Sequence, residues 1–212
     1  MTKKEKVLEI KEILDREYPK AECTLDYTNP LHLLIATQLA AQCTDARVNL
    51  VTPALFERYK TAADFAAADI KELESYIYST GFYHNKAKNI IGCCKMIEEK
   101  FGGEVPSTME ELTSLPGVGR KTANIIIGDI HHKPAVVVDT HCKRIAKRLG
   151  LTKNTDPTKV EFDLAKILPP DYTYIFCHQI VYHGRQYCKS QRPDCELCPL
   201  NVLCPKIDVK GA

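Results

Sequence analysis

Apolar residues recur with helical spacing in almost every periodic segment of this chain. Valine, leucine and isoleucine stand three or four positions apart over residues 3–16 and again over 85–101, the pattern of a helix with one buried face. Asn29-Pro30 and Asp156-Pro157 each place a capping side chain before a proline, which is typical of a helix start. The one strand-like run, residues 136–138, is too short to form a sheet. The pattern predicts an all-α fold.

Further helix starts are predicted where a polar residue precedes an apolar run. Thr44 and Asp69 are expected to cap two helices in the first half of the chain. Within Ser107-Thr108-Met109-Glu110, a serine is followed three residues later by a glutamate, which is the capping-box pattern. We therefore expect a helix capped by Ser107, with Glu110 reaching back to the cap.

Composition limits the class of protein. With 212 residues, of which 44% are hydrophobic and 26% charged, the chain has the composition of a globular protein of one or two domains. Its longest apolar stretches, such as 125–127 and 135–138, are far shorter than the roughly 20 residues of a membrane helix. The first residues alternate lysine with glutamate and lack the apolar core of a signal peptide. We expect a cytoplasmic protein with no membrane partner.

The charge of the chain is unevenly distributed. A net charge of +2 does not by itself suggest a nucleic-acid partner, but between residues 113 and 148 seven basic residues stand against two acidic ones. A solvated helix face is the ordinary explanation of such a run. Contact with nucleic-acid phosphates is the alternative, because a local surplus of positive charge attracts them even on a nearly neutral protein.

The ten cysteines fall into two groups. Six are scattered and are expected to be small buried side chains, because disulfides are rare in a chain without an export signal. The other four form a C-x6-C-x2-C-x5-C run with few apolar residues to order it. Four thiolates can hold a metal, and the wide spacing favours a 4Fe–4S iron–sulfur cluster over the alternative, a zinc ion. The expected ligands are Cys188, Cys195, Cys198 and Cys204.

Residues 115–128 read LPGVGRKTANIIIG and contain the most informative turn. Pro116 ends the preceding helix, Gly117 and Gly119 permit a tight turn, and a second helix begins at Arg120. A helix–hairpin–helix of this kind leaves the first N–H groups of the second helix pointing outward, where a phosphate can bind. For the two glycines alone, an ordinary corner between helices is the alternative.

Several segments resemble the endonuclease III family of DNA glycosylases. LPGVGRKTAN (115–124) is similar to the helix–hairpin–helix of that family, VDTHCKR (138–144) to its aspartate-bearing loop, and the cysteine run to its iron–sulfur motif. AAQCTD (40–45), GFYHNKA (81–87) and HGRQYC (183–188) also fit the family. The resemblance covers nearly the whole chain, with the motifs in the same order.

The resemblance implies a function and an architecture. It implies a base excision repair enzyme that removes oxidised pyrimidines from duplex DNA and then cuts the strand as an AP lyase, by β-elimination. It implies a six-helix barrel domain with the hairpin over residues 22–132, and an iron–sulfur cluster domain from residues 1–21 and 133–212. The implied cofactor is one 4Fe–4S cluster, and the implied partner is damaged double-stranded DNA. We expect a monomer associated with the nucleoid.

The resemblance assigns catalysis to Lys121 and Asp139. Strand cleavage after base removal needs an amine that attacks C1′ of the sugar and forms a Schiff base, and Lys121 stands in the first turn of the second hairpin helix. Asp139 precedes Thr140 after an apolar run, so it can also cap the following helix. A carboxylate near the sugar would stabilise the positive charge that develops on the ring.

The family fills the gap left by an extruded base with a glutamine and an apolar residue, and Gln42 and Phe82 match those positions. Most relatives have leucine in place of Phe82 and serine in place of Ala40, so the wedge and the lesion pocket are expected to differ here. His183 is expected to hydrogen-bond to backbone or to cluster sulfur. The other expected DNA contacts are Gly117, Gly119, Arg120, His141, Lys143, Arg144, Lys189 and Arg192.

Two other functions compete with this interpretation. An adenine-excising or mismatch-specific relative would carry the same cluster but typically lacks a lysine at the position of Lys121. A non-catalytic DNA-binding protein would tolerate the loss of Lys121 or Asp139. Both residues are present, which favours the enzyme that combines base removal with strand cleavage.

Overall fold

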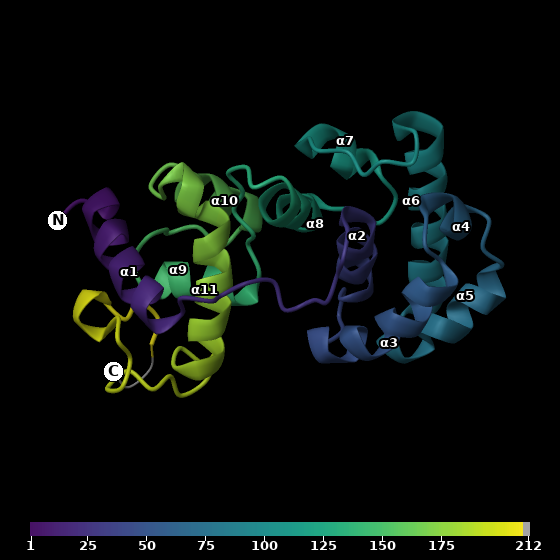
Figure 1. The fold of residues 1–212 in the computed structure, drawn as a ribbon. Coiled ribbons are helices and arrows are strands. Elements are labelled where there is room, and N and C mark those ends of the chain that lie inside the picture. Colours follow the sequence, from purple (N-terminus) through teal and green to yellow (C-terminus); the bar gives the residue numbers. More distant parts are fainter. Residues whose placement is uncertain (210–212) are drawn as a thin grey trace. The chain divides into compact units, whose positions relative to one another are not determined.

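The computed structural model describes residues 1–209, and within that range every regular element is a helix (Figure 1). The predicted all-α fold is therefore confirmed. Residues 136–138, the strand-like run, are buried or half-buried but pair with no strand in the described chain. No helix among residues 1–209 is long and apolar enough to cross a membrane.

Contacts between Cα atoms divide the chain into two compact units. The continuous unit comprises Cys23–His131, and the discontinuous unit comprises Met1–Glu22 together with His132–Ala212. These boundaries lie one residue from those expected from the sequence. The assignment of the two units to a barrel domain and a cluster domain stays a prediction.

In the continuous unit, α2 (Pro30–Leu39) is buried on nearly all sides, as expected for an apolar helix at the centre of a bundle. α4 and α5 pack against α6, whose buried face carries Ile90, Cys94 and Ile97. The remaining helices of this unit are α3 (Asp45–Arg58), α4 (Ala62–Ala66), α5 (Ile70–Ile77), η1 (Tyr78–Thr80), α6 (Tyr83–Phe101), α7 (Met109–Ser114), α8 (Arg120–Ile125) and η2 (Ile126–Ile130).

The helix starts expected from capping residues agree with the structure with one exception. Asn29, Thr44 and Asp69 cap their helices as predicted. The expected cap at Ser107 is wrong, because Thr108 caps α7 and its hydroxyl accepts from the Glu111 amide at 3.2 Å. Both registers place a glutamate three residues after a hydroxyl, so the capping pattern cannot distinguish them. The register with Thr108 as the cap is the one in which Leu112 is fully buried.

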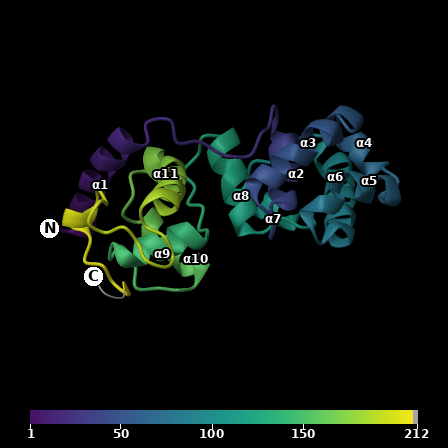
Figure 2. The same cartoon turned by 90° about the horizontal axis from the view of Figure 1, so that it is seen from below.

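The discontinuous unit builds one core from both ends of the chain. Val7, Ile10 and Leu14 of the first helix pack with apolar residues from the second half, and α9 packs against α11 (Figure 2). Leu200, inside the cysteine run, is fully buried in the same core. The helices are α1 (Lys3–Glu17), α9 (Thr140–Arg148), α10 (Pro157–Ala165), η3 (Pro170–Tyr172), α11 (Thr173–Gln186) and η4 (Asn201–Leu203).

Candidate active site and cysteine pocket

The turn between α7 and α8 fits closely against its own unit. Gly117 has a φ of +75°, in the left-handed region that residues other than glycine rarely adopt. A Cβ atom there would lie 2.8 Å from Oε1 of Gln38 and 2.9 Å from Cβ of Asn89. The Val118 amide donates to the Leu115 carbonyl at 3.1 Å and closes the turn. The packing of the unit therefore requires a glycine at position 117.

Gly119 differs, because nothing in the described chain requires a glycine at this position. Its φ of −98° and ψ of 176° are those of extended backbone, and an added Cβ would meet no heavy atom within 4 Å. The Gly119 carbonyl accepts from the Ala123 amide at 2.9 Å, but no side chain in residues 1–209 caps α8. The outer side of the turn is thus open to close approach by another molecule.

Lys121, the second residue of α8, is exposed. Ala123 and Asn124 of the same helix are buried, so α8 packs on one side and presents Lys121 on the other. Arg120 is half-buried and interacts with other parts of the protein. The amine that the sequence singled out is therefore accessible at the surface beside the hairpin.

Gln42 and Phe82 are both exposed and both have a left-handed backbone. Gln42, between α2 and α3, has a φ of +55°, and Phe82, the residue before the start of α6, has a φ of +49°. The Phe82 side chain is 63% exposed. Left-handed backbone at a residue other than glycine is strained and persists only where the surroundings hold it, commonly at binding sites. Ala40, at the end of α2, is half-buried.

Asp139 caps α9, which confirms the capping role expected from the sequence. Its Oδ1 accepts a hydrogen bond of 2.6 Å from the Cys142 amide, and its backbone is extended. The cap fixes the direction of the carboxylate and uses one of its two oxygens. Asp139 lies in the discontinuous unit, and Lys121 lies in the continuous unit.

The basic residues of α9 are largely engaged inside their own unit. Arg144 donates to the Cys188 carbonyl from Nε at 3.2 Å and from Nη2 at 2.8 Å. Lys147 forms an ion pair of 2.6 Å with Asp208. Arg148 is 7% exposed. The side-chain ammonium of Lys143, in contrast, has no hydrogen-bond or ion-pair partner among the described residues, and Lys143 is half-buried. Among the basic residues of α9, Lys143 is therefore the one most available to an external phosphate.

His141 packs tightly against α11. An added Cβ on Gly184 would collide with Nδ1 of His141, so the glycine makes room for the ring. The same nitrogen lies 3.1 Å from Nη2 of Arg144. Burial lowers the pKa of His141, with Asp139 opposing that shift and Arg144 adding to it. The neutral imidazole can accept from the guanidinium, which gives His141 a role in positioning Arg144.

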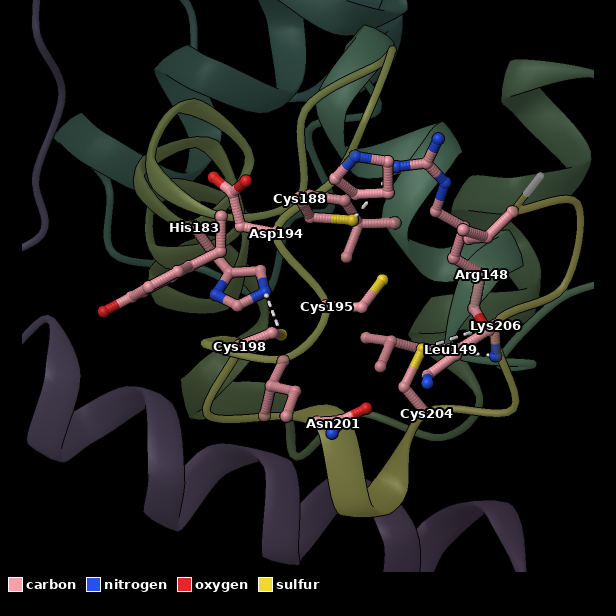
Figure 3. A pocket seen from close by; sticks show the side chains of 15 residues that line it. Arg148, Leu149, His183, Cys188, Asp194, Cys195, Cys198, Asn201, Cys204 and Lys206 are labelled. Carbon is pink, nitrogen blue, oxygen red and sulfur yellow. Dashed lines mark hydrogen bonds between the residues drawn. The ribbon is translucent and has the colours of Figure 1, made fainter. Parts of the chain in front are cut away.

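The four cysteines of the run line one pocket beside the core of the discontinuous unit (Figure 3). The pocket encloses about 380 Å³ of space, including the part open to solvent, and Figure 3 shows the four sulfurs around the same hollow. No three His, Cys, Asp or Glu side chains within residues 1–209 converge as one metal ion would require. Burial raises the pKa of the Cys198 thiol to about 11. The four residues predicted as ligands, Cys188, Cys195, Cys198 and Cys204, thus all line this pocket.

Two residues contact these sulfurs directly. His183, which is 1% exposed, places Nε2 3.4 Å from Sγ of Cys198 and Nδ1 3.3 Å from the Tyr18 hydroxyl. Burial lowers the pKa of His183 to about 4, so its ring is neutral. Arg148 places Nη1 3.3 Å from Sγ of Cys188. The predicted contact between His183 and a ligand sulfur is present.

The loop between the first two cysteines is held from α9. Arg148 donates to the Lys189 carbonyl at 2.6 Å and to the Ser190 carbonyl at 2.9 Å. Lys189 pairs with Asp194 at 2.7 Å, and Arg192 is exposed with a φ of +47°. The loop is therefore ordered by a buried arginine, and it presents the two basic side chains that the sequence suggested for DNA contact.

Two well-placed side chains were not identified from the sequence. Arg148 was counted only as part of the basic run, although its three bonds to residues 188–190 make it a support of the cysteine loop. Lys86 lies within the quoted segment GFYHNKA but is 5% exposed and bonds to two backbone carbonyls. The residue types alone could not predict these buried positions, because arginine and lysine side chains are ordinarily solvated.

Comparisons with family models, with known sequences and with solved structures all indicate the same family. A model described as HhH-GPD superfamily base excision DNA repair protein matches residues 35–170. Endonuclease III from Synechocystis sp. is 54% identical, covering 96% of this chain and 94% of that protein. Endonuclease III from Bacillus subtilis is 46% identical, covering 92% and 90%. A solved structure of a non-covalent endonuclease III–DNA complex superimposes with a TM-score of 0.91 at 44% identity, covering 97% of each chain.

Proposed function

Since the chain belongs to the endonuclease III family of HhH-GPD base excision DNA repair proteins, we propose that it excises oxidised pyrimidines from duplex DNA and then cleaves the strand at the abasic site. The glycosylase activity on DNA follows from the family. The observation that carries the strand-cleaving step is Lys121, an exposed amine in the first turn of the helix that follows the hairpin.

The chemistry requires an amine that forms and later releases a covalent bond. Nζ of Lys121 attacks C1′ of the damaged nucleotide, the bond from C1′ to the base breaks, and the base leaves with the electron pair and takes up a proton. The nitrogen then expels O4′, which opens the sugar ring and takes up the proton that the amine gives up, and the iminium left at C1′ makes the C2′ proton acidic. Its removal breaks the C3′–O bond by β-elimination, and water then hydrolyses the iminium and returns the free lysine.

Asp139 supports this chemistry through charge. The bond between its Oδ1 and the Cys142 amide fixes the carboxylate at the start of α9. Directed toward the sugar, the carboxylate would stabilise the positive charge that develops as the base departs, and it would assist proton transfer. The cap and the catalytic role are compatible because the cap uses one carboxylate oxygen.

Binding to damaged duplex DNA, which would associate the protein with the nucleoid, requires that the lesion be turned out of the helix. Gln42 and Phe82 are suited to fill the space left behind, because both are exposed on strained backbone. The open side of Gly119 would admit a phosphate-bearing backbone to the N–H groups of α8. The further contacts that we assign to DNA are Gly117, Arg120, His141, Lys143, Lys189 and Arg192. Arg144, which donates to the Cys188 carbonyl, is assigned a supporting role instead.

The cysteine pocket fits a 4Fe–4S cluster better than a single zinc ion. The four thiols surround a common hollow, and the wide C-x6-C-x2-C-x5-C spacing of the run favours the broader group over a single ion. Burial disfavours the thiolates, and bound iron would supply the positive charge that stabilises them. The cluster would supply a rigid support for the loop that carries Lys189 and Arg192.

Covalent trapping tests the proposal. With borohydride and duplex DNA containing an abasic site, the protein should form a stable cross-link, and Lys121→Ala should abolish both the cross-link and strand cleavage while duplex binding persists. Lys71→Ala is the matched control, because it also removes one exposed lysine of the continuous unit, on α5. Cross-linking that persists in Lys121→Ala would refute the assignment of the nucleophile.

A further inference from the structure

A buried lysine connects the two segments that precede Gln42 and Phe82. Lys86 lies near the start of α6 and is 5% exposed. Its Nζ donates to the Leu39 carbonyl at 2.8 Å and to the Thr80 carbonyl at 2.9 Å. These two carbonyls are 41 positions apart in the sequence, and a single ammonium group joins them.

Each of the two carbonyls needs a donor from outside its own segment. Leu39 is the last residue of α2 and Thr80 is the last residue of η1, so neither carbonyl continues a helical ladder. A buried carbonyl without a hydrogen-bond partner destabilises the fold, because it loses its bond to water and gains none in return. An ammonium makes stronger hydrogen bonds than a neutral donor does, and a cation at the end of α2 also interacts favourably with the helix dipole.

Burying a charged group is nevertheless expensive. Burial lowers the pKa of Lys86, and the nearby Cys43 opposes that shift. Its neighbour Ala87 and the core residue Ile90 on the same helix are apolar, so the fold has an inexpensive way to fill this region. A lysine here is better explained by the connection it makes than by the volume it fills.

The two connected segments lead to Gln42 and Phe82, the two exposed residues with strained backbone, which we call the tips. Leu39 stands three residues before Gln42, and Thr80 stands two residues before Phe82. Over residues 23–131, all of which the structure describes, Gln42 and Phe82 are the only residues other than glycine with a left-handed backbone. Lys86 therefore fixes the backbone two or three residues before each strained residue, at Thr80 and at Leu39.

We propose that Lys86 is a positioning residue that sets the spacing between the Gln42 tip and the Phe82 tip, so that both enter the duplex together at the damaged position. This inference rests on the proposed function, in which those two side chains occupy the space vacated by the lesion. Without the ammonium, each tip keeps its own loop but loses its fixed distance from the other.

The direct test is Lys86→Met, which keeps the length of the side chain and removes both hydrogen bonds. Excision of an oxidised pyrimidine from duplex DNA in a single turnover should slow by about tenfold to a hundredfold, because small errors in positioning are costly. Cross-linking to a single-stranded abasic oligonucleotide should keep the wild-type rate, because no partner base must be displaced there. An equal loss on both substrates would indicate a general defect and overturn the proposal.

Two matched variants separate position from charge. Lys88→Met removes an exposed positive charge from the same helix and should leave both rates unchanged. Lys86→Arg keeps a buried cation that can donate to both carbonyls, and it should recover at least part of the duplex rate. The proposal would also be overturned if Lys86→Arg were as slow as Lys86→Met on duplex DNA and were also slower than wild type on the single-stranded oligonucleotide.

A second measurement does not depend on how well Lys86→Met folds. If one nitrogen fixes both tips, Gln42→Ala and Phe82→Ala should have non-additive effects on duplex excision. If neither variant slows excision, the proposed DNA contact itself fails. If each slows excision and the effects are additive, the DNA contact stands and the role of Lys86 is refuted.

Discussion

The hairpin turn of the continuous unit (residues 115–119) and the cysteine loop of the discontinuous unit (residues 188–195) are both short and outside any helix, yet they are ordered by different means. Backbone geometry dominates at the hairpin, where Gly117 has a left-handed φ and an added Cβ would lie within 3 Å of Gln38 and Asn89. Side chains dominate at the cysteine loop, where Arg148 bonds to three successive residues and four thiols face one hollow. A loop ordered by its backbone is sensitive to one added methyl group, whereas a loop ordered by side chains depends on its ligands.

The largest effect is expected from a cysteine of the pocket. The purified protein should be brown, contain about four irons per chain and absorb broadly in the visible range, as thiolate-bound iron does. Cys198→Ser should lose iron, solubility and DNA affinity before it loses the chemistry of Lys121. Cys23→Ser, in the continuous unit, is the control and should keep its iron. One zinc per chain would refute the cluster and leave the glycosylase function standing.

The two glycines of the hairpin should separate folding from binding. Gly117→Ala should lower the free energy of unfolding by about 1–3 kcal/mol, because its φ is positive and its Cβ would collide with Asn89 and Gln38. Gly119→Ala should change stability by less than about 0.5 kcal/mol, since the added methyl meets nothing in the described chain. Thermal unfolding and titration with duplex DNA measure the two effects.

The expected result for Gly119→Ala is wild-type thermal stability with weakened duplex binding. Unchanged affinity would mean that no external backbone approaches this side of the turn. A loss of stability equal to that of Gly117→Ala would mean that the two glycines share one structural role.

The smallest effect concerns the basic residues of α9. Lys143→Ala should reduce the slope of log affinity against log salt concentration by about one, because one phosphate contact is lost. Arg144→Ala should leave the slope unchanged and lower the melting temperature, because its guanidinium is bonded to the Cys188 carbonyl. Salt titrations of the two single variants show which of the two side chains contacts a phosphate. A reduced slope in Arg144→Ala would mean that this side chain leaves the Cys188 carbonyl to bind DNA.

Sequence patterns predicted the elements of this fold better than the contacts between them. Proline and capping residues located α2, α3, α5 and α10, because a helix start is determined by a few consecutive residues. Two equivalent capping patterns one residue apart gave the wrong cap for α7. The start of α6 was also displaced, since it begins at Tyr83 on a strained Phe82 rather than at Asn85.

In the candidate site, too, local features could be predicted from the sequence, whereas contacts between distant residues could not. The grouping of the four cysteines and the cap formed by Asp139 could be predicted, because the spacing of a cysteine run and the position of a cap are local properties of the chain. The contacts of Arg144, Arg148 and Lys86 join residues about 40 or more positions apart, and no local pattern distinguishes such a side chain from a solvated one. Long basic side chains that bond to distant carbonyls are recognised only when the fold is known.

The discontinuous unit also determines the order in which the protein can fold as it is made. α1 leaves the ribosome before the other described helices, but its buried residues Val7, Ile10 and Leu14 pack against helices made after residue 139. The continuous unit, whose chain is complete at His131, can fold while α1 still waits for its partners. During that interval the apolar face of α1 is exposed to chaperones and proteases, and it becomes protected only after α9 and α11 have been synthesised.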